Sequence, residues 1–370
     1  MNQQSSLGRF DDWLTDDSDV AALVMRQWLV PVEGRDAVVF PPTYAKPERM
    51  GEEDWPGYNI DRLSDGSSVC LIDSVGSQAN RMEPIFMRDG YKRLVPQITI
   101  RLKKTGNGQK IVSLLEAGHR AADAVVRFSD LRDEFKAAFT DARDKADASR
   151  LAKIAPTSLV FGVWDSRDTQ VKLPRIVRSV IRAYNVEPLH RSAQYIPPVD
   201  YKQEGVLEIP ESQEKQASEL GLQHAPAAWT HGGVQVKREI RRDACLNMAA
   251  LRSLRAGAQA DPLPLRRYIL GLSLVAFTAP QETHLREGCQ LVPDPDRPPE
   301  WKLVRHDGRS ERCMIDHAAA RQYAEEAAQA FGVGESREAS FDPRAATSTL
   351  SKTKEERKKS RRQAAESTEE

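Results

Sequence analysis

Hydrophobic positions along the chain follow two different spacings. Short segments that are rich in β-branched residues, or bounded by turn residues, predict strands. Longer segments in which Ala, Leu, Glu and Arg recur at helical spacing predict helices. The predicted strands are 37–40, 68–72, 97–102 and 157–163. The predicted helices are 113–128, 133–153, 238–255 and 265–277.

These elements alternate without the regular rhythm of a doubly wound sheet, which favours an α+β fold. We predict a single domain over residues 1–334, in which the polar, weakly patterned segment at about 205–228 is a surface excursion. Almost no large apolar residue occurs from residue 335 onward. Because such a segment cannot bury a core, 335–370 is predicted to be a disordered, charged tail.

Charge is distributed unevenly, although 54 Lys and Arg balance 54 Asp and Glu. Residues 1–66 hold thirteen acidic side chains against six basic ones. Three segments are basic instead: 80–110, 172–191 and 237–267. The neutral total argues against a protein that coats nucleic acid by charge alone. It leaves room for basic surfaces, although any one charged run is more often a solvated face.

Signatures of enzyme chemistry are scarce in this sequence. It has no GxSxG, P-loop or HExxH motif. Cys313 and His317 lie four residues apart, but one such pair is a weak signal, and neither a metal site nor a cofactor is predicted. We therefore expect a binding protein rather than an enzyme.

The chain has features of a cytoplasmic protein. Its first ten residues lack the apolar stretch of a signal peptide, and the apolar run at 268–277 is too short to span a bilayer. The four cysteines are scattered, which fits a reducing compartment. We expect no membrane partner.

The segment 71–83 holds the most informative polar pattern. A short apolar strand ends just before Asp73 and Ser74, and either residue is suited to cap a helix that starts there. Four polar residues then recur at i, i+3, i+4 and i+7 on one helix face: Ser74, Ser77, Gln78 and Arg81. Hydroxyl, amide and guanidinium groups can all donate to phosphate oxygens. A solvated helix face without a ligand explains the pattern equally well.

The segment 172–184 holds a second polar pattern. Arg175, Arg178 and Arg182 are three and then four residues apart, so a helix would place them on one stripe. The segment is also rich in β-branched residues, so a strand is nearly as well supported. Both geometries present several arginines. Tyr184 and Tyr195 have the chemistry to stack on bases, although buried tyrosines are commoner.

Several longer motifs resemble a known family. They are FPPTYA at 40–45, YNID at 58–61, the motif at 73–83, PTSLVFGVWDS at 156–166, the stretch at 173–184 and RSAQY at 191–195. In this order they resemble the backbone subunit of the type I-U (I-G) CRISPR effector complex, or Cascade, a RAMP-superfamily protein. Weaker resemblance continues through LREGC at 285–289, to about residue 331.

The resemblance implies a ferredoxin-like, RRM-like palm with inserted finger and thumb elements. It implies that several copies oligomerise along one CRISPR guide RNA in an antiviral ribonucleoprotein. The implied partners are the CRISPR guide RNA, the target DNA strand through the guide, further copies of the same chain and other Cascade subunits. The implied role is structural, since a separate helicase-nuclease cuts the DNA.

Two functional hypotheses follow. In the first, the chain is a guide-RNA backbone protein whose RNA contacts are Ser74, Ser77, Gln78, Asn80, Arg81, Arg175, Arg178 and Arg182. In the alternative, it is a RAMP-type endoribonuclease that processes the CRISPR transcript. That reaction needs a general base near a Tyr or Lys, and His190 with Tyr195 is the best pair available. Asp73, Asp130 and Asp165 are further candidates by analogy with RNA-cutting relatives, and the sequence singles out none of them.

Overall fold

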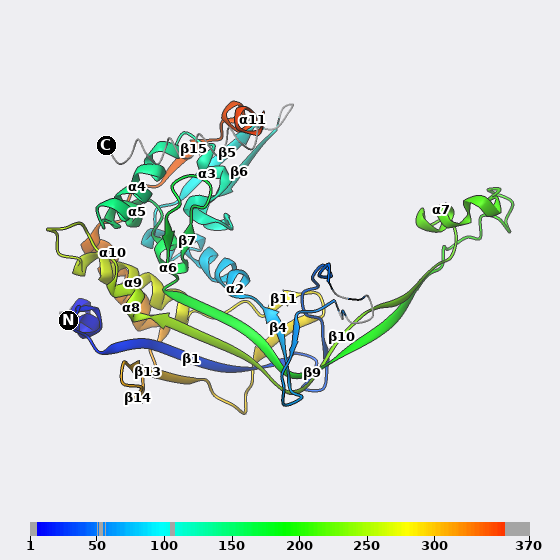
Figure 1. Ribbon diagram of the computed structural model, residues 1–370, viewed down its shortest axis with the longest axis horizontal. Helices are drawn as coiled ribbons and strands as arrows, with labels where there is room; N and C mark the ends of the chain where they lie inside the picture. Colours follow the sequence, from blue (N-terminus) through cyan, green and yellow to red (C-terminus); the bar gives the residue numbers. More distant parts are fainter. Residues whose placement is uncertain (1–5, 50, 52–54, 56, 104–107, 352–370) are drawn as a thin grey trace.

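The computed structural model describes residues 6–49, 51, 55, 57–103 and 108–351. These residues form a ten-stranded antiparallel main sheet, helices that cover one of its faces, a second lobe, and a long projecting ribbon (Figure 1). The predicted α+β fold is confirmed, and the structure shows that the main sheet is antiparallel.

The main sheet is centred on four strands that lie side by side in the order β1, β10, β9 and β4. Strand β1 is long enough to pair with β10 on one side and with both β13 and β12 on the other. The strands of this sheet are β1 Val20–Pro31, β2 Val38–Val39, β3 Ile60–Arg62, β4 Ser68–Asp73, β9 Val177–Tyr195, β10 Ala225–Asn247, β11 His284–Arg286, β12 Cys289–Pro293, β13 Glu300–Arg305 and β14 Ser310–Arg312.

Helices pack on one face of this sheet. Between Leu265 and Phe277 every residue of α9 except Arg267 is buried, as expected of a helix that is apolar on all sides. Helix α10 lies directly against it, since a Cβ added to Gly271 would be 2.8 Å from the Cα of Ala324. The helices of this layer are α1 Asp11–Leu14, α2 Val75–Met82, α8 Met248–Arg252, α9 Leu263–Thr278 and α10 His317–Phe331.

A second lobe, mostly helical, follows α2 in the chain. Its short helices are α3 Ala124–Arg127, α4 Arg132–Asp144, α5 Ser149–Ile154 and α6 Pro156–Phe161, and α11 Pro343–Ser351 lies near them (Figure 1). Its strands are β5 Ile98–Lys103, β6 Gln109–Ser113 and β15 Arg337–Ser340 in one small sheet, and β7 Val163–Trp164 with β8 Lys172–Leu173 in another. Turns of 3₁₀ helix are η1 Leu7–Phe10, η2 Glu83–Met87, η3 Lys92–Leu94, η4 Leu114–Glu116, η5 Arg120–Ala122 and η6 Glu211–Gln213.

The ribbon is the outer part of β9 and β10, which stay paired far beyond the main sheet (Figure 1). The pairing runs from Val177 opposite Leu246 to Tyr195 opposite Ala225. At the far end the chain turns back through η6 and α7 Glu214–Glu219, and this end is the ribbon tip, residues 196–224. Most of the segment 205–228, predicted as a surface excursion, lies in the tip.

The element predictions were correct where the pattern was simple. The strands expected at 68–72 and 97–102 correspond to β4 and β5, the short one at 37–40 contains β2, and the helix expected at 265–277 is α9. The helix expected at 133–153 is interrupted between α4 and α5, where Ala146 has a φ of 48°. The helix expected at 113–128 consists only of 3₁₀ turns and the short α3.

Two predictions were wrong in type. Residues 238–247 form the inner part of strand β10 rather than a helix, and only α8 within 238–255 is helical. Residues 157–161 form helix α6 rather than a strand. All six residues of α6 are buried, and periodicity cannot separate a strand from a helix that is buried on every side.

The boundary predicted for the disordered tail was too early. Residues 337–340 form β15, which pairs in parallel with β5, and Ala339 is buried. Backbone hydrogen bonds and one small side chain hold this strand, so the scarcity of large apolar residues was misleading. Residues 352–370 lie outside the described part of the chain.

Candidate nucleic-acid interface

The junction between β4 and α2 is built around Asp73, whose side chain is fully buried. Ser74 caps α2, because its side chain accepts a hydrogen bond from the backbone N–H of Ser77, as predicted. The first turn of the helix then points back at Asp73. The Ser77 hydroxyl donates to Oδ1 at 2.8 Å, and the Gln78 amide donates to Oδ2 at 2.7 Å.

Two arginines complete the surroundings of Asp73. Arg81 on α2 donates to Oδ2 at 3.1 Å, and Arg286 on β11 donates to Oδ1 at 3.3 Å. The same guanidinium groups also bind backbone carbonyls, Arg81 that of Leu285 and Arg286 that of Ile72. Because a buried carboxylate needs such partners, Asp73 ties α2 to β4 and β11.

The predicted stripe of exposed donors is therefore wrong in its orientation. Gln78 is buried. The side chains of Ser77, Gln78 and Arg81 each donate a hydrogen bond to the Asp73 carboxylate rather than to solvent. Asn80 is the exposed member of the set, and its Oδ1 accepts a 3.4 Å hydrogen bond from Arg120. Ser74 is a helix cap. These residues position α2 against the sheet.

The series of side-chain hydrogen bonds that starts at Asp73 continues from α2 into the sheet. The Ser179 hydroxyl on β9 donates to Oε1 of Gln78 at 2.8 Å. The Arg242 guanidinium on β10 donates in turn to Ser179 at 2.9 Å. Ser179 and Arg242 thus lie on the sheet face that the helices cover.

Arg178 and Arg182 lie on the opposite, open face of the sheet. Side chains alternate between faces along a strand, and Ser179 between them points to the helices. Arg178 is exposed and Arg182 is half-buried. Within the described ranges neither of these side chains forms a hydrogen bond or an ion pair. The strand geometry that the sequence left open brings these two arginines onto one face.

Arg175 does not join this pair, because it precedes the first residue of β9. Its side chain is about half-buried, and one of its terminal nitrogens, Nη1, is buried without a hydrogen-bond partner. Burial, and secondarily the nearby charge of Arg120, lowers the pKa of Arg175. Arg178 and Arg182 therefore lie on the open sheet face, whereas Arg175 lies in a partly buried site near Arg120.

The open face also holds a cluster that the sequence analysis missed. Arg241 on β10, directly opposite Arg182, lies over the Tyr184 ring at 4.4 Å and donates to its hydroxyl at 2.8 Å. Trp28 on β1 lies opposite Arg241, with Arg297 over its ring at 4.2 Å. The strand alternation of 238–246 would have revealed the cluster if that segment had been interpreted as a strand.

Acidic groups neutralise part of this cluster. Arg241 pairs with Asp243 at 2.9 Å and with Glu239 at 3.0 Å. Burial works against ionisation of Glu239, but hydrogen bonds from Trp28 and Arg297 outweigh it, and the pKa of this carboxyl lies below its usual value. Arg178 and Arg182 thus keep guanidinium groups that are free for an anion such as phosphate, as does the exposed Arg312 on the same face of the sheet.

The acidic N-terminal segment neutralises much of the third basic segment. Asp16 pairs with Arg266 at 2.7 Å and with Arg255 at 2.9 Å, and Asp11 pairs with Arg267. Arg242 is buried. The segment 237–267 therefore presents less positive charge than its composition indicates.

The candidate catalytic groups are not brought together. His190 and Tyr195 are five residues apart on strand β9, a separation of about 16 Å along the strand. Because the separation is an odd number of residues, their side chains point to opposite faces of the ribbon. Asp165 accepts hydrogen bonds from the backbone N–H and the hydroxyl of Thr169, and Asp130 accepts from the backbone N–H of Ser340. Asp73 is enclosed by four side-chain donors.

The residues that the structure describes contain no group of three or more side chains placed to hold a metal ion. In the weak pair singled out above, both ring nitrogens of His317 are engaged, Nε2 with Tyr91 and Nδ1 with Thr278, at 2.8 Å each. Burial, together with Arg321, lowers the pKa of His317. Over the described residues no helix has the length and apolarity to cross a bilayer.

Comparison with known proteins gives one match, to a family model. No curated protein matches the chain significantly. Residues 23–188, a little under half of the chain, match the family model described as CRISPR-associated protein GSU0053. The matched span runs from β1 into β9, and so includes Asp73, α2, Arg178 and Arg182. Over these residues the chain is similar to the GSU0053 group of CRISPR-associated proteins.

Proposed function

We propose that the chain is the CRISPR RNA-binding backbone subunit of a type I surveillance complex, and that several copies oligomerise along one guide RNA. The observation that carries the proposal is the open face of β9. There the side chains of Arg178 and Arg182 have no hydrogen-bond or ion-pair partner among the described residues, and the half-buried ring of Tyr184 lies on the same face. Free guanidinium groups suit phosphates, and aromatic rings suit sugars or unstacked bases.

In this proposal the two polar regions have different roles. Arg178 and Arg182 contact the RNA backbone directly, and Asn80 is the best placed of the α2 residues to add a contact, because its side chain is exposed. Ser74, Ser77, Gln78 and Arg81 act as positioning residues that hold α2 on the sheet. We propose a structural rather than an enzymatic role, consistent with the separation of His190 from Tyr195.

The decisive experiment is co-purification. The chain is expressed with a CRISPR array, purified, and any bound RNA is sequenced. The proposal expects guide-length RNA with many different spacer sequences, since phosphate contacts carry no sequence information. Absence of RNA, or retention of one sequence only, would contradict it.

Incubation of the purified chain with a labelled repeat RNA tests the enzymatic alternative. We expect binding without cleavage. A cut at one defined position would instead favour the endoribonuclease, and loss of that cut in His190→Ala would identify the base.

A further inference from the structure

Three charged side chains meet where the second lobe joins α2. Glu83, which follows α2, is buried and accepts a 2.7 Å hydrogen bond from Nε of Arg120 on η5. The terminal nitrogens of Arg120 make longer contacts of 3.4 Å, to the Gly162 carbonyl and to Oδ1 of Asn80. Arg175 packs against the same glycine, since a Cβ added to Gly162 would be 2.6 Å from its Cγ. The cluster thus places two guanidinium groups beside each other, and Glu83 pairs with one of them.

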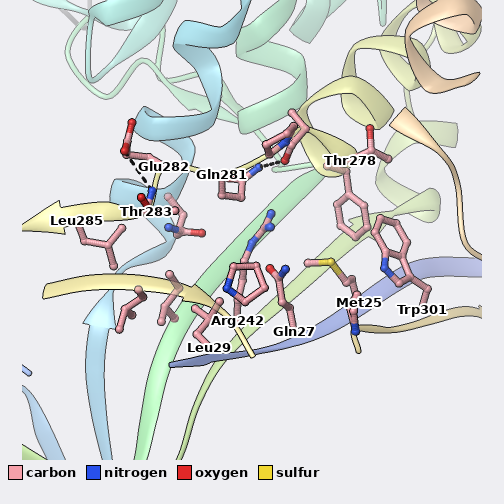
Figure 2. Close-up of a pocket in the computed structure, with 18 residues that line it drawn as sticks. Met25, Gln27, Leu29, Arg242, Thr278, Gln281, Glu282, Thr283, Leu285 and Trp301 are labelled. Atoms are coloured by element: carbon pink, nitrogen blue, oxygen red, sulfur yellow. Dashed lines mark hydrogen bonds between the residues drawn. The ribbon is translucent and has the colours of Figure 1, made fainter. Parts of the chain in front are cut away.

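Arg175 differs from the fully buried arginines of the described chain, which all donate hydrogen bonds. Arg242 lines a cavity that also includes Glu282 (Figure 2), and its Nε donates to Ser179 at 2.9 Å. Arg252 donates to two backbone carbonyls. The half-buried side chain of Arg175 makes no hydrogen bond or ion pair with any described residue, and its Nη1 is buried. Its charge is therefore poorly compensated within the chain.

A guanidinium group in this condition suits an oxyanion, because its planar fork donates two parallel hydrogen bonds to a phosphate or a carboxylate. Arg120 adds a second positive charge beside Arg175. The exposed side chain of Asn80 adds a donor, since its Oδ1 accepts from Arg120 and its amide nitrogen is left to donate. In the proposed function RNA supplies a matching anion, its phosphate.

Glu83 gives the cluster a proton that exchanges near neutral pH. Burial raises the pKa of Glu83 to about 7, against the opposing effects of Arg120 on η5 and of the Thr157 hydroxyl on α6. One of its oxygens, Oε1, is buried without a well-formed hydrogen bond. Negative charge bound beside Arg120 disfavours a second negative charge on Glu83 and so raises the pKa of Glu83 further. Anion binding should therefore be accompanied by proton uptake.

We propose that Arg175, with Arg120 and Asn80, binds a phosphate group, and that this binding is coupled to uptake of a proton by Glu83. The proposal rests on the proposed function in so far as RNA is the source of the phosphate. It adds a second phosphate site, at the junction of the second lobe with α2 rather than on the open sheet face. It also adds a pH dependence for which Arg178 and Arg182 give no reason.

The pH dependence of RNA affinity tests the coupling. Fluorescence anisotropy is measured from about pH 6 to about pH 8 with a short oligouridine, whose charge is constant over this range. Affinity should be highest where Glu83 is protonated, below its pKa of about 7 in the free chain, and should fall as the pH rises. We expect a fall of about tenfold, which corresponds to a change of one unit in the pKa of Glu83 on binding.

Glu83→Gln keeps the size of the side chain and removes the ionisation. Its RNA affinity should stay at the acidic wild-type level throughout the pH range. A wild-type affinity that does not change with pH would overturn the proposal, as would a pH dependence that persists in Glu83→Gln.

Arg175→Met tests the phosphate contact, because Met keeps an apolar stem against Gly162 and lacks the guanidinium group. We expect RNA affinity at about pH 6 to fall about tenfold or more. The melting temperature should be unchanged or higher, since a buried nitrogen without a partner is removed. Arg150→Met, which changes an exposed arginine of α5 that pairs with Asp141, is the matched control and should bind as wild type. Wild-type affinity in a folded Arg175→Met chain would overturn the proposal.

Isothermal titration calorimetry of the wild-type chain needs no variant. Titration of RNA at about pH 7 in two buffers of different ionisation enthalpy gives the number of protons exchanged; we expect uptake, and zero uptake or release would overturn the proposal. Sulfate, which keeps its charge over this range, is titrated in parallel as a free anion. If the chain binds no RNA but binds sulfate through Arg175 with proton uptake, the proposed function fails and the site stands. If RNA binds but Arg175→Met and Glu83→Gln change nothing with either probe, the site fails and the proposed function stands.

Discussion

The arginines around α2 and the arginines of β9 are alike in sequence but different in the structure. Arg81 and Arg286 converge on the buried Asp73. Arg178 and Arg182, on the open face of the sheet, have no acidic partner among the described residues. Arg81, Arg178 and Arg182 all occur in basic stretches of the chain. The comparison shows that one buried acid decides whether an arginine holds the fold together or stays available to a ligand.

The physical reason lies in solvation. A carboxylate that the fold removes from water must be compensated by donors from the protein itself. Asp73 therefore accepts hydrogen bonds from four side chains, those of Ser77, Gln78, Arg81 and Arg286. Arginines on an open face keep their water, which they can exchange for phosphate contacts with release of counterions.

The largest effect is expected from Asp73→Ala. It leaves two arginines and a buried amide without their acceptor, so we expect a loss of about 3–5 kcal/mol in the free energy of unfolding. Chemical denaturation monitored by circular dichroism measures it. Asp61→Ala, on the exposed strand β3, is the matched control and should change stability by less than about 0.5 kcal/mol. A stable Asp73→Ala protein would remove the basis of the comparison.

The double variant Arg178→Ala with Arg182→Ala tests whether the arginines of the open face bind RNA. We expect RNA affinity to fall by about 2–4 kcal/mol, since each arginine makes a charge-assisted hydrogen bond to phosphate, while the melting temperature changes little. The plot of log K against log salt should become shallower by about 0.7 for each phosphate that is no longer neutralised. Fluorescence anisotropy on a short single-stranded RNA measures both quantities. Arg344→Ala, which changes an exposed arginine on α11 in the second lobe, should behave as wild type.

Arg81→Ala separates the two roles in one residue. As a partner of Asp73 it should cost about 1.5–3 kcal/mol of folding stability, with RNA affinity per folded molecule unchanged. Paired melting and binding measurements on the same sample decide the question. Wild-type stability with reduced RNA affinity would show that Arg81 contacts RNA, as the sequence predicted.

The smallest effect is expected from Ser74→Ala, which removes the cap of α2. Removal of a cap typically costs about 1 kcal/mol. Thermal melts should show this destabilisation, whereas Ser64→Ala in an exposed turn should melt as wild type. RNA affinity that fell without a change in stability would show that Ser74 contacts the ligand.

The sequence predicted those parts of the fold in which one periodicity dominates. Helix α9 is apolar throughout, and β4 is a short run that ends at a polar cap. The inner part of β10 was misinterpreted because the covered face holds the charged Arg242 among Ile240, Ala244 and Leu246. A buried cation interrupts the alternation of apolar and polar residues from which a half-buried strand is identified.

The candidate site was predicted by residue type better than by role. The prediction that Asp73 or Ser74 caps a helix starting there was correct, and Ser74 is the cap, because a cap depends on neighbouring residues alone. The sequence could not reveal that Arg286, more than two hundred residues away, meets Asp73, or that Arg175 lies outside β9. Those facts depend on long-range strand pairing, for which a single sequence carries no direct signal.

The projecting ribbon also has a consequence for its backbone amides. In the described chain, residues 186–195 of β9 pair with no strand except β10, and residues 225–233 of β10 pair with no strand except β9. An isolated two-stranded ribbon is at best marginally stable in water. Its amide hydrogens should therefore exchange with solvent deuterium much faster in the free chain than those of β1 or α9. Any partner that covers the ribbon would slow this exchange, so mass-resolved exchange of residues 186–195 would report assembly directly, even in a mixture where the partner has not been identified.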